Sequence, residues 1–292
     1  MQSLFECIPC IVRQTLDIAR LNNLSEQKKL KLMRTVMKKL EKVDPHKTTP
    51  PEATKWAHEI IKKELGKKDL YAKEKIKQNK LALKHLPWAE KEVKRAKDKL
   101  LTSVRLAIAG NIIDYGTASY FDLSGSLKAL EHQQFAINDY ARLKKAVSKP
   151  GLVLYIGDNA GEIAFDKILV KELMKRKHVV HYAIKSEPVL NDSLMKDAKT
   201  VGMDKLVPVL ESGSTTAGTL LKEATPAFKK LYDLADIIIA KGQGNFETLP
   251  LSDKRIFFLL KMKCVYLGHK VDTELGDILL IQGNQNIAKK LG

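Results

Sequence analysis

Two adjacent oxygen-bearing side chains, Asp158 and Asn159, stand directly after a short apolar run and a glycine. The run is Leu152–Ile156, and beyond Gly161 apolar residues recur at helical spacing. This pattern predicts a buried parallel strand, a tight turn and the start of a helix. In an open α/β sheet such a turn lies where ligands bind, and carboxylate and amide oxygens suit Mg²⁺ or Mn²⁺. The same pair is equally typical of a turn that caps a helix, so this stretch alone leaves the two interpretations level.

From residue 151 onward, short apolar runs alternate with helical patterns. This alternation predicts an α/β fold with a doubly wound, mostly parallel, Rossmann-like sheet. Asp192 follows the second run, a Ser/Thr/Gly-rich segment over 212–219 follows the third, and Lys241 ends the fourth. The carboxyl edge of the sheet is therefore expected to gather acids, amides, hydroxyls and lysines. The predicted strands are Leu152–Ile156, Val179–Ile184, Leu206–Leu210, Ile237–Ala240 and Val265–Leu267.

These polar residues fit a metal-assisted site. Asp158, Asn159 and Asp192 would give a metal three oxygen ligands and leave positions for water and a phosphate oxygen. Asp192 also fits the N-cap of a helix over 193–200, and a capping carboxylate keeps a second oxygen for a metal. The segment over 212–219 either supplies backbone N–H groups to a phosphate or is an ordinary flexible loop. The substrate contacts selected from it are Ser212, Gly213 and Thr216.

Two lysines are further candidates. Lys241 lies at a predicted strand end, where burial is costly unless the ammonium meets an anion. Lys261 interrupts an apolar region, and its alternative is an exposed position on a helix. The chain has neither a G-x-x-x-x-G-K-[ST] segment nor a G-x-G-x-x-G spacing, which excludes the two common nucleotide-binding motifs.

Residues 1–148 are predicted to form an α-helical region, and residues 149–292 an α/β metal- and phosphate-binding domain. The helical region carries Cys7 and Cys10 as a CxxC, for which two packed cysteines on a helix is the simpler local interpretation. It also carries Asn111 and Asp114, which lie three residues apart and face the same way on a helix. They either contribute a polar patch to the neighbouring site or belong to an ordinary helix end.

The bulk composition limits the function classes. With 292 residues and 44% hydrophobic content the chain can bury a substantial core, and it has no apolar run of the roughly 20 residues that span a membrane. Three cysteines do not make a disulfide scaffold, and without a signal-peptide pattern at its start we expect a cytoplasmic protein. The net charge of +17 suits an anionic substrate or a lysine-rich surface. Nucleic acid is disfavoured as a partner because no recognition motif accompanies the charge.

Taken together, these segments resemble the metal-dependent damage-control phosphatase family, and within it the prokaryotic and archaeal subfamily with an N-terminal CxxC. The matching segments occur in the expected order over nearly the whole chain. They are Cys7-x-x-Cys10, Gly110-Asn111-x-x-Asp114, Gly157-Asp158-Asn159-Ala160-Gly161-Glu162, Asn191-Asp192 and Lys241-Gly242-Gln243-Gly244-Asn245-Phe246-Glu247.

The resemblance implies a phosphomonoesterase that uses a divalent metal, typically Mn²⁺, Co²⁺ or Ni²⁺, or else Mg²⁺. Its substrates would be small phosphorylated metabolites, including damaged, sugar-related and nucleotide-related ones. By the family pattern Asp158, Asn159 and Asp192 hold the metal, and Lys261 binds phosphate, with Lys263 two residues away as a rival. The substrate contacts in the Lys-Gly-x-x-Asn segment would be Gln243, Asn245 and Glu247.

Three side chains are assigned to catalysis: Asp158, Lys241 and Lys261. The lysines would stabilise charge that develops on the phosphoryl group. Attack by water is favoured over attack by Asp158, because a carboxylate that already binds a metal is a poorer nucleophile. The competing functions are a non-enzymatic anion or nucleic-acid binding protein and a small-molecule transferase.

Overall fold

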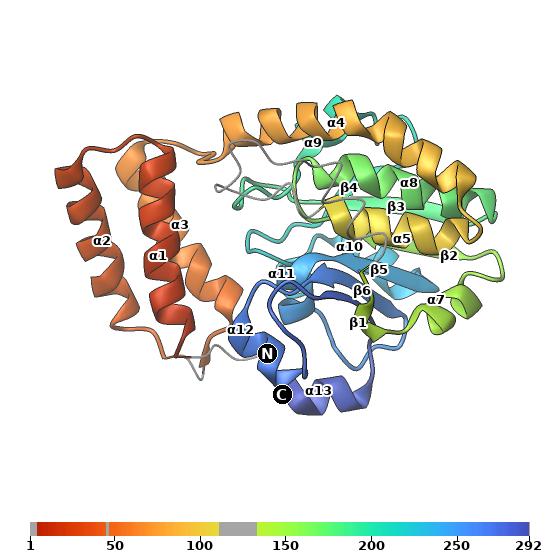
Figure 1. Cartoon of the computed structure of the whole chain (residues 1–292). Coiled ribbons are helices and arrows are strands. Elements are labelled where there is room, and N and C mark those ends of the chain that lie inside the picture. Colours follow the sequence, from red (N-terminus) through yellow and green to blue (C-terminus); the bar gives the residue numbers. More distant parts are fainter. Residues whose placement is uncertain (1–4, 45–46, 111–132, 292) are drawn as a thin grey trace.

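A computed structural model describes residues 5–44, 47–110 and 133–291. Helices come first along the chain, and a seven-stranded sheet with helices on both faces follows (Figure 1). The predicted fold class is confirmed. The first helices are α1 (Cys7–Leu21), α2 (Glu26–Leu40), α3 (Pro50–Leu65), α4 (Ala72–Arg95) and α5 (Lys99–Ala109). The later ones are α7 (Tyr140–Ala146), α8 (Glu162–Lys175), α9 (Met195–Val201), α10 (Pro226–Leu234), α11 (Gly242–Thr248), α12 (Val265–Lys270) and α13 (Gln285–Leu291).

The sheet has the strand order β1-β7-β6-β5-β2-β3-β4. All neighbouring strands are parallel except β6 and β7, which pair antiparallel. The chain runs from β2 outward to β3 and β4 and then returns to place β5 on the other side of β2. The strands are β1 (Phe135–Asn138), β2 (Leu152–Ile156), β3 (Val179–Ile184), β4 (Val209–Glu211), β5 (Ile237–Lys241), β6 (Ile256–Lys261) and β7 (Ile278–Gln282).

The strand predicted over Val265–Leu267 is wrong. These residues form the first turn of α12, where the Cys264 Sγ accepts a hydrogen bond from the Leu267 amide at 3.4 Å. The strand lies earlier, at β6, whose continuous apolar run cannot be told from a buried helix by periodicity. The alternative of an exposed helix position for Lys261 is also wrong, because Lys261 is the last residue of β6.

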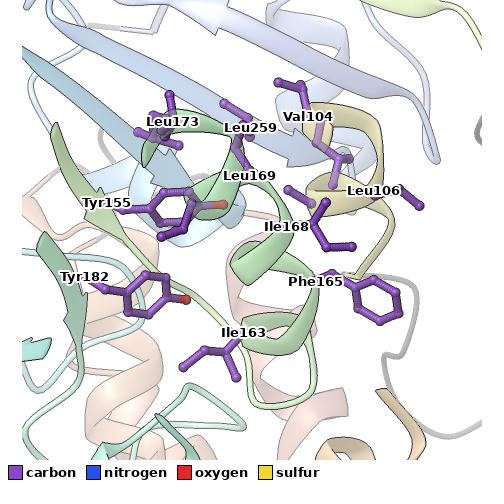
Figure 2. Packing of buried hydrophobic residues seen from close by; sticks show 14 of the residues in the cluster. Val104, Leu106, Tyr155, Ile163, Phe165, Ile168, Leu169, Leu173, Tyr182 and Leu259 are labelled. Atoms are coloured by element: carbon purple, nitrogen blue, oxygen red, sulfur yellow. The ribbon is translucent and has the colours of Figure 1, made fainter. Parts of the chain in front are cut away.

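Two apolar cores lie on opposite faces of the sheet. The first packs α4, α5 and α8 against one face of the sheet, including residues of β2 and β3, and part of it is drawn in Figure 2. The second joins α10, α11 and α13 to the other face. A third core holds α1, α2 and α3 together. The sheet and its first core therefore include residues on both sides of position 148, the domain boundary that we predicted from the sequence.

The α1–α3 bundle is linked to the loops at the carboxyl edge of the sheet by polar contacts. Lys55 Nζ in α3 lies 3.0 Å from Glu223 Oε1, and Lys62 Nζ donates to the Pro188 carbonyl at 2.5 Å. α3 also packs against α11, which follows β5. Among the described residues, no helix has both the length and the apolar character needed to cross a membrane.

Candidate active site

The point where the strand order reverses lies between β2 and β5. In doubly wound sheets a crevice for ligands opens there, outside the carboxyl ends of the two strands. Asp158 lies two residues after the end of β2, and Gly242 directly follows the end of β5. A Cβ on Gly242 would lie 1.9 Å from Asp158 Oδ2, and Gly242 has a φ of +79°. Only glycine lets the two loops approach so closely.

The loops after β2 and β3 are joined by backbone hydrogen bonds. Asn159 and Asp192 form an isolated antiparallel bridge. The Ala160 amide donates to the Asn191 carbonyl at 2.8 Å, and the Ser193 amide donates to the Asp158 carbonyl at 2.8 Å. These bonds bring together the three residues that the sequence selected as metal ligands.

Helix α4 contacts the loop that follows β2 and holds it in place. Asn79 Oδ1 accepts a hydrogen bond from the Gly161 amide at 2.7 Å, and its Nδ2 donates to Asp197 Oδ1 at 2.8 Å. Gly161 has a φ of +79°, and an added Cβ would press on Gln78 of α4. The helical part of the chain therefore takes part in shaping the site loop.

The two carboxylates of the site differ in exposure, since Asp192 is buried and Asp158 is half-buried, and they influence each other electrostatically. Burial and then the neighbouring Asp192 raise the pKa of Asp158 to about 7. Burial also raises the pKa of Asp192 to about 6, although Lys185 and Lys75 lower it. Asp192 is 2% exposed, and its Oδ2 accepts no hydrogen bond from the residues that the structure describes. The Lys185 ammonium lies 3.6 Å from this oxygen, and a buried carboxylate oxygen without a hydrogen bond fits a cation ligand.

The donor set has the chemistry of a hard divalent metal site. It offers two carboxylates and, in Asn159, one amide oxygen, which are ligands that Mg²⁺ and Mn²⁺ accept. In residues 5–44, 47–110 and 133–291, no three His, Cys, Asp or Glu side chains are grouped so that they could hold a metal. Beside the two carboxylates, the Asn159 amide oxygen is the candidate for a third protein ligand at this edge of the sheet.

The site is also rich in positive charge. The lysines that most lower the pKa of Asp158 are Lys263, Lys241 and Lys185, in that order. Lys185 follows β3, is 4% exposed, and its Nζ lies 3.6 Å from Asp192 Oδ2 and donates to the Gly218 carbonyl. Sequence analysis did not select Lys185. Its position could have suggested it, because Lys185 directly follows β3 in the same way that Lys241 stands at the end of β5.

Comparison with known proteins identifies the family. Residues 3–279 match the damage-control phosphatase ARMT1-like domain. The chain belongs to this family. It is 31% identical to the damage-control phosphatase PH1575 of Pyrococcus horikoshii, over 97% of this chain and 98% of that one. It is also 33% identical to the uncharacterized protein MJ0202 of Methanocaldococcus jannaschii, over 95% of this chain and 94% of that one.

A solved structure agrees with the family assignment. The crystal structure of a DUF89 family protein from Pyrococcus horikoshii superposes on this damage-control phosphatase family member with a TM-score of 0.87. The two are 31% identical, and the match covers 97% of this chain and 99% of the other. The resemblance noted in the sequence is thereby confirmed.

In this family member Lys241 is fully buried behind the site. Its Nζ donates to the Ala107 carbonyl at 2.7 Å, to Asp166 Oδ1 at 2.7 Å, and to Glu162 Oε1. These three bonds occupy all three ammonium hydrogens. The lysine does meet anions, as its position at a strand end predicted, but the anions are carboxylates of α8. Its direct action on a phosphoryl group, assigned from the sequence, would require one of these bonds to break.

The segment over 212–219 is held by hydrogen bonds within itself and to neighbouring residues, which argues against an ordinary flexible loop. The Thr215 amide donates to Glu223 Oε2 at 3.0 Å, and Ser214 and Thr216 hydroxyls lie 3.0 Å apart. Gly213, at φ +85°, donates its amide to Ser186 Oγ at 2.8 Å. The hydroxyl of Ser212 has no hydrogen-bond partner among the described residues.

The Lys-Gly-x-x-Asn segment forms α11, and its side chains differ in what they contact. Asn245 donates to the carbonyls of Gly157 and Lys241, at 3.3 and 2.7 Å, so it joins the ends of β2 and β5. Gln243 donates to Glu247 Oε1 at 2.7 Å and accepts from the Lys263 amide at 3.0 Å. Burial raises the pKa of Glu247 to about 7.

The remaining candidates are the two cysteines of α1 and two residues that lie outside the described residues. Asn111 and Asp114 lie outside the described residues, so their role stays a prediction. Cys7 and Cys10 lie at the start of α1, and neither forms a disulfide with a described cysteine. Burial and the nearby Cys264 raise the pKa of the Cys10 thiol.

Proposed function

We propose that this family member is a metal-dependent phosphatase that hydrolyses phosphomonoesters of small metabolites in the cytoplasm. One observation carries the proposal: a half-buried and a buried carboxylate, both with raised pKa values, meet an amide at the strand-order switch point, with lysines beside them. An electrophilic metal and an anionic substrate are the partners that such a cluster suits. Membership of the damage-control phosphatase family supports the reaction class.

Asp158, Asn159 and Asp192 would hold the divalent metal, which is Mn²⁺, Ni²⁺, Co²⁺ or Mg²⁺. Bound there, the metal would supply Lewis-acid stabilisation of charge on the phosphoryl group. The ionised forms of both aspartates are the ones that bind a metal, and burial disfavours those forms while the site holds no cation.

We infer that two lysines bind the phosphoryl oxygens. Lys263 is the lysine that lowers the pKa of Asp158 most, and its backbone amide donates a hydrogen bond to Gln243. We therefore assign phosphate binding to Lys263 in preference to Lys261, and we add Lys185 on the opposite side, next to Asp192. Water attacks phosphorus, and Asp158 serves as a ligand. The substrate is a small phosphorylated metabolite, of the damaged, sugar-related or nucleotide-related kind.

The test is phosphate release from p-nitrophenyl phosphate and from a panel of phosphometabolites, with EDTA or with each of the four metals. Asp158→Ala is compared with wild type and with Asp204→Ala, a matched change at an exposed aspartate that precedes β4. We expect metal-restored release in wild type and Asp204→Ala, and its loss in folded Asp158→Ala. Full metal-stimulated activity in Asp158→Ala would remove this aspartate from the site. Folded wild type that releases no phosphate with any metal would overturn the proposed reaction.

A further inference from the structure

A cluster of charged groups lies inside the first apolar core, directly under the site loop. Glu162 and Asp166 on α8 and Lys241 at the end of β5 are all 0% exposed. Figure 2 shows apolar side chains of this core and the hydroxyls of Tyr155 and Tyr182, which are directed toward α8. Burying charges in such surroundings carries a desolvation penalty that an ion pair often fails to recover, so stability alone is a weak reason for them.

Asp166 accepts three hydrogen bonds within the cluster. Asp166 Oδ1 accepts hydrogen bonds from Tyr155 at 2.6 Å and from Lys241 at 2.7 Å. Its Oδ2 accepts from the Tyr182 hydroxyl at 2.6 Å. Three donors from three strands therefore fix this carboxylate, and the carboxylate in turn fixes the ammonium of Lys241.

Glu162 connects this cluster to the site. One of its oxygens, Oε1, accepts from Lys241. The other, Oε2, accepts from Asn159 twice, from the backbone N at 3.4 Å and from the side-chain Nδ2 at 3.3 Å. Asn159 Nδ2 also donates to Asp158 Oδ2 at 3.0 Å.

These contacts decide which atom of the Asn159 amide is available. With Nδ2 committed to Glu162 and Asp158, the oxygen Oδ1 remains as the acceptor that a cation can use. An amide turned by 180° would present an NH₂ group to the cation and its oxygen to two carboxylates, which is repulsive on both sides.

We propose that Glu162, Lys241 and Asp166 form a positioning chain that holds the Asn159 amide with its oxygen toward the metal. This inference rests on the proposed function, because it assigns Asn159 as a metal ligand. Lys241 is then a positioning residue that acts through Glu162, in place of the direct role on the phosphoryl group that the sequence suggested.

The first test is the Mn²⁺ affinity of Glu162→Gln, measured by isothermal titration calorimetry. Glutamine has one acceptor where glutamate has two, so either Lys241 or the Asn159 Nδ2 must face an NH₂ group. Outer-shell partners of metal ligands are typically worth about 10–100-fold in affinity, and we expect a loss in that range. The matched control is Glu172→Gln, the same change at a buried glutamate further along α8, bonded to Arg176 at 3.3 Å. It should bind Mn²⁺ as wild type does.

A double-mutant cycle separates positioning from a merely structural role. If Glu162 acts through Asn159, Glu162→Gln should cost little further Mn²⁺ affinity in an Asn159→Ala background. Additive losses would overturn the proposal, as would wild-type Mn²⁺ affinity in folded Glu162→Gln.

Asp166→Asn provides a second test of the positioning chain if Glu162→Gln does not fold. It keeps the size of the side chain and removes the charge that holds Lys241, and it should also weaken Mn²⁺ binding. Wild-type affinity in folded Asp166→Asn would remove Asp166 from the chain. Wild type that neither binds Mn²⁺ nor releases phosphate would instead reject the proposed function, so the two failures are distinguishable.

Discussion

Replacing Gly242 by alanine should inactivate the enzyme while leaving the fold in place. The added Cβ would lie 1.9 Å from Asp158 Oδ2, whereas real Cβ atoms essentially never come closer than 3.0 Å. The carboxylate must therefore move by about 1 Å, the difference between these distances. The whole carboxylate must swing away, because its Cγ would lie only 2.4 Å from the added Cβ, but the three nearest atoms all belong to this side chain and none to the backbone.

The expected loss of activity follows from that displacement. Misplacing a reacting group by about 1 Å typically costs on the order of 100-fold in rate. We expect a fall of that size in kcat/KM for metal-supported p-nitrophenyl phosphate hydrolysis, together with weaker Mn²⁺ binding. The positive φ of +79° adds a backbone cost of about 1 kcal/mol to the free energy of unfolding.

Gly66→Ala is the matched control. Gly66 also has a left-handed backbone, at φ +61°, but nothing lies within 4 Å of an added Cβ. Both variants should lose a similar amount of stability in thermal unfolding, and only Gly242→Ala should lose activity. If Gly242→Ala kept wild-type kcat/KM and Mn²⁺ affinity, the close approach of the β2 and β5 loops would not define the site.

Two further predictions concern single charged residues. Lys263→Ala should lower kcat/KM for p-nitrophenyl phosphate by about 100-fold, the scale for one lost electrostatic contact to a transition state, and Lys261→Ala by much less; the reverse order would restore Lys261 as the phosphate ligand. Burial alone would raise the pKa of Asp98, but hydrogen bonds, the largest from Lys144, lower it to about 2. An unfolded aspartate titrates near 3.9, so the stabilisation is present above about pH 4 and is lost as the pH falls toward 2. Urea unfolding of Asp98→Asn should show a smaller loss of stability over that window than wild type.

The strands that the sequence predicted well are those with clear boundaries. β2, β3 and β5 are short apolar runs that end at a glycine, a lysine or another polar residue, and their predicted bounds differ from the observed ones by one residue at most. β6 and β7 were missed because an apolar run buried on both faces has no alternation that identifies it. β1 was missed because only Phe135 of its four residues is buried.

The candidate site was predictable in its residue types and only partly in its geometry. Asp158, Asn159 and Asp192 follow strands that the sequence places side by side, so their meeting at one edge could be expected. Nothing local distinguishes Lys263 from Lys261, since both flank the same methionine. The choice between them depends on their relation to Asp158, more than 100 positions earlier in the chain.

By itself, the sequence determined the order of strands and helices at the centre of the domain, the chemistry of the loops that follow the strands, and the family. The tertiary structure decided which groups those side chains meet. Lys241 illustrates the difference: its position at a strand end predicted an anionic partner, but the partners proved to be Glu162 and Asp166, 79 and 75 residues away. Hydrogen bonds and Coulomb attraction act through space, so the partner of a buried charge is set by packing of elements that are remote in the chain.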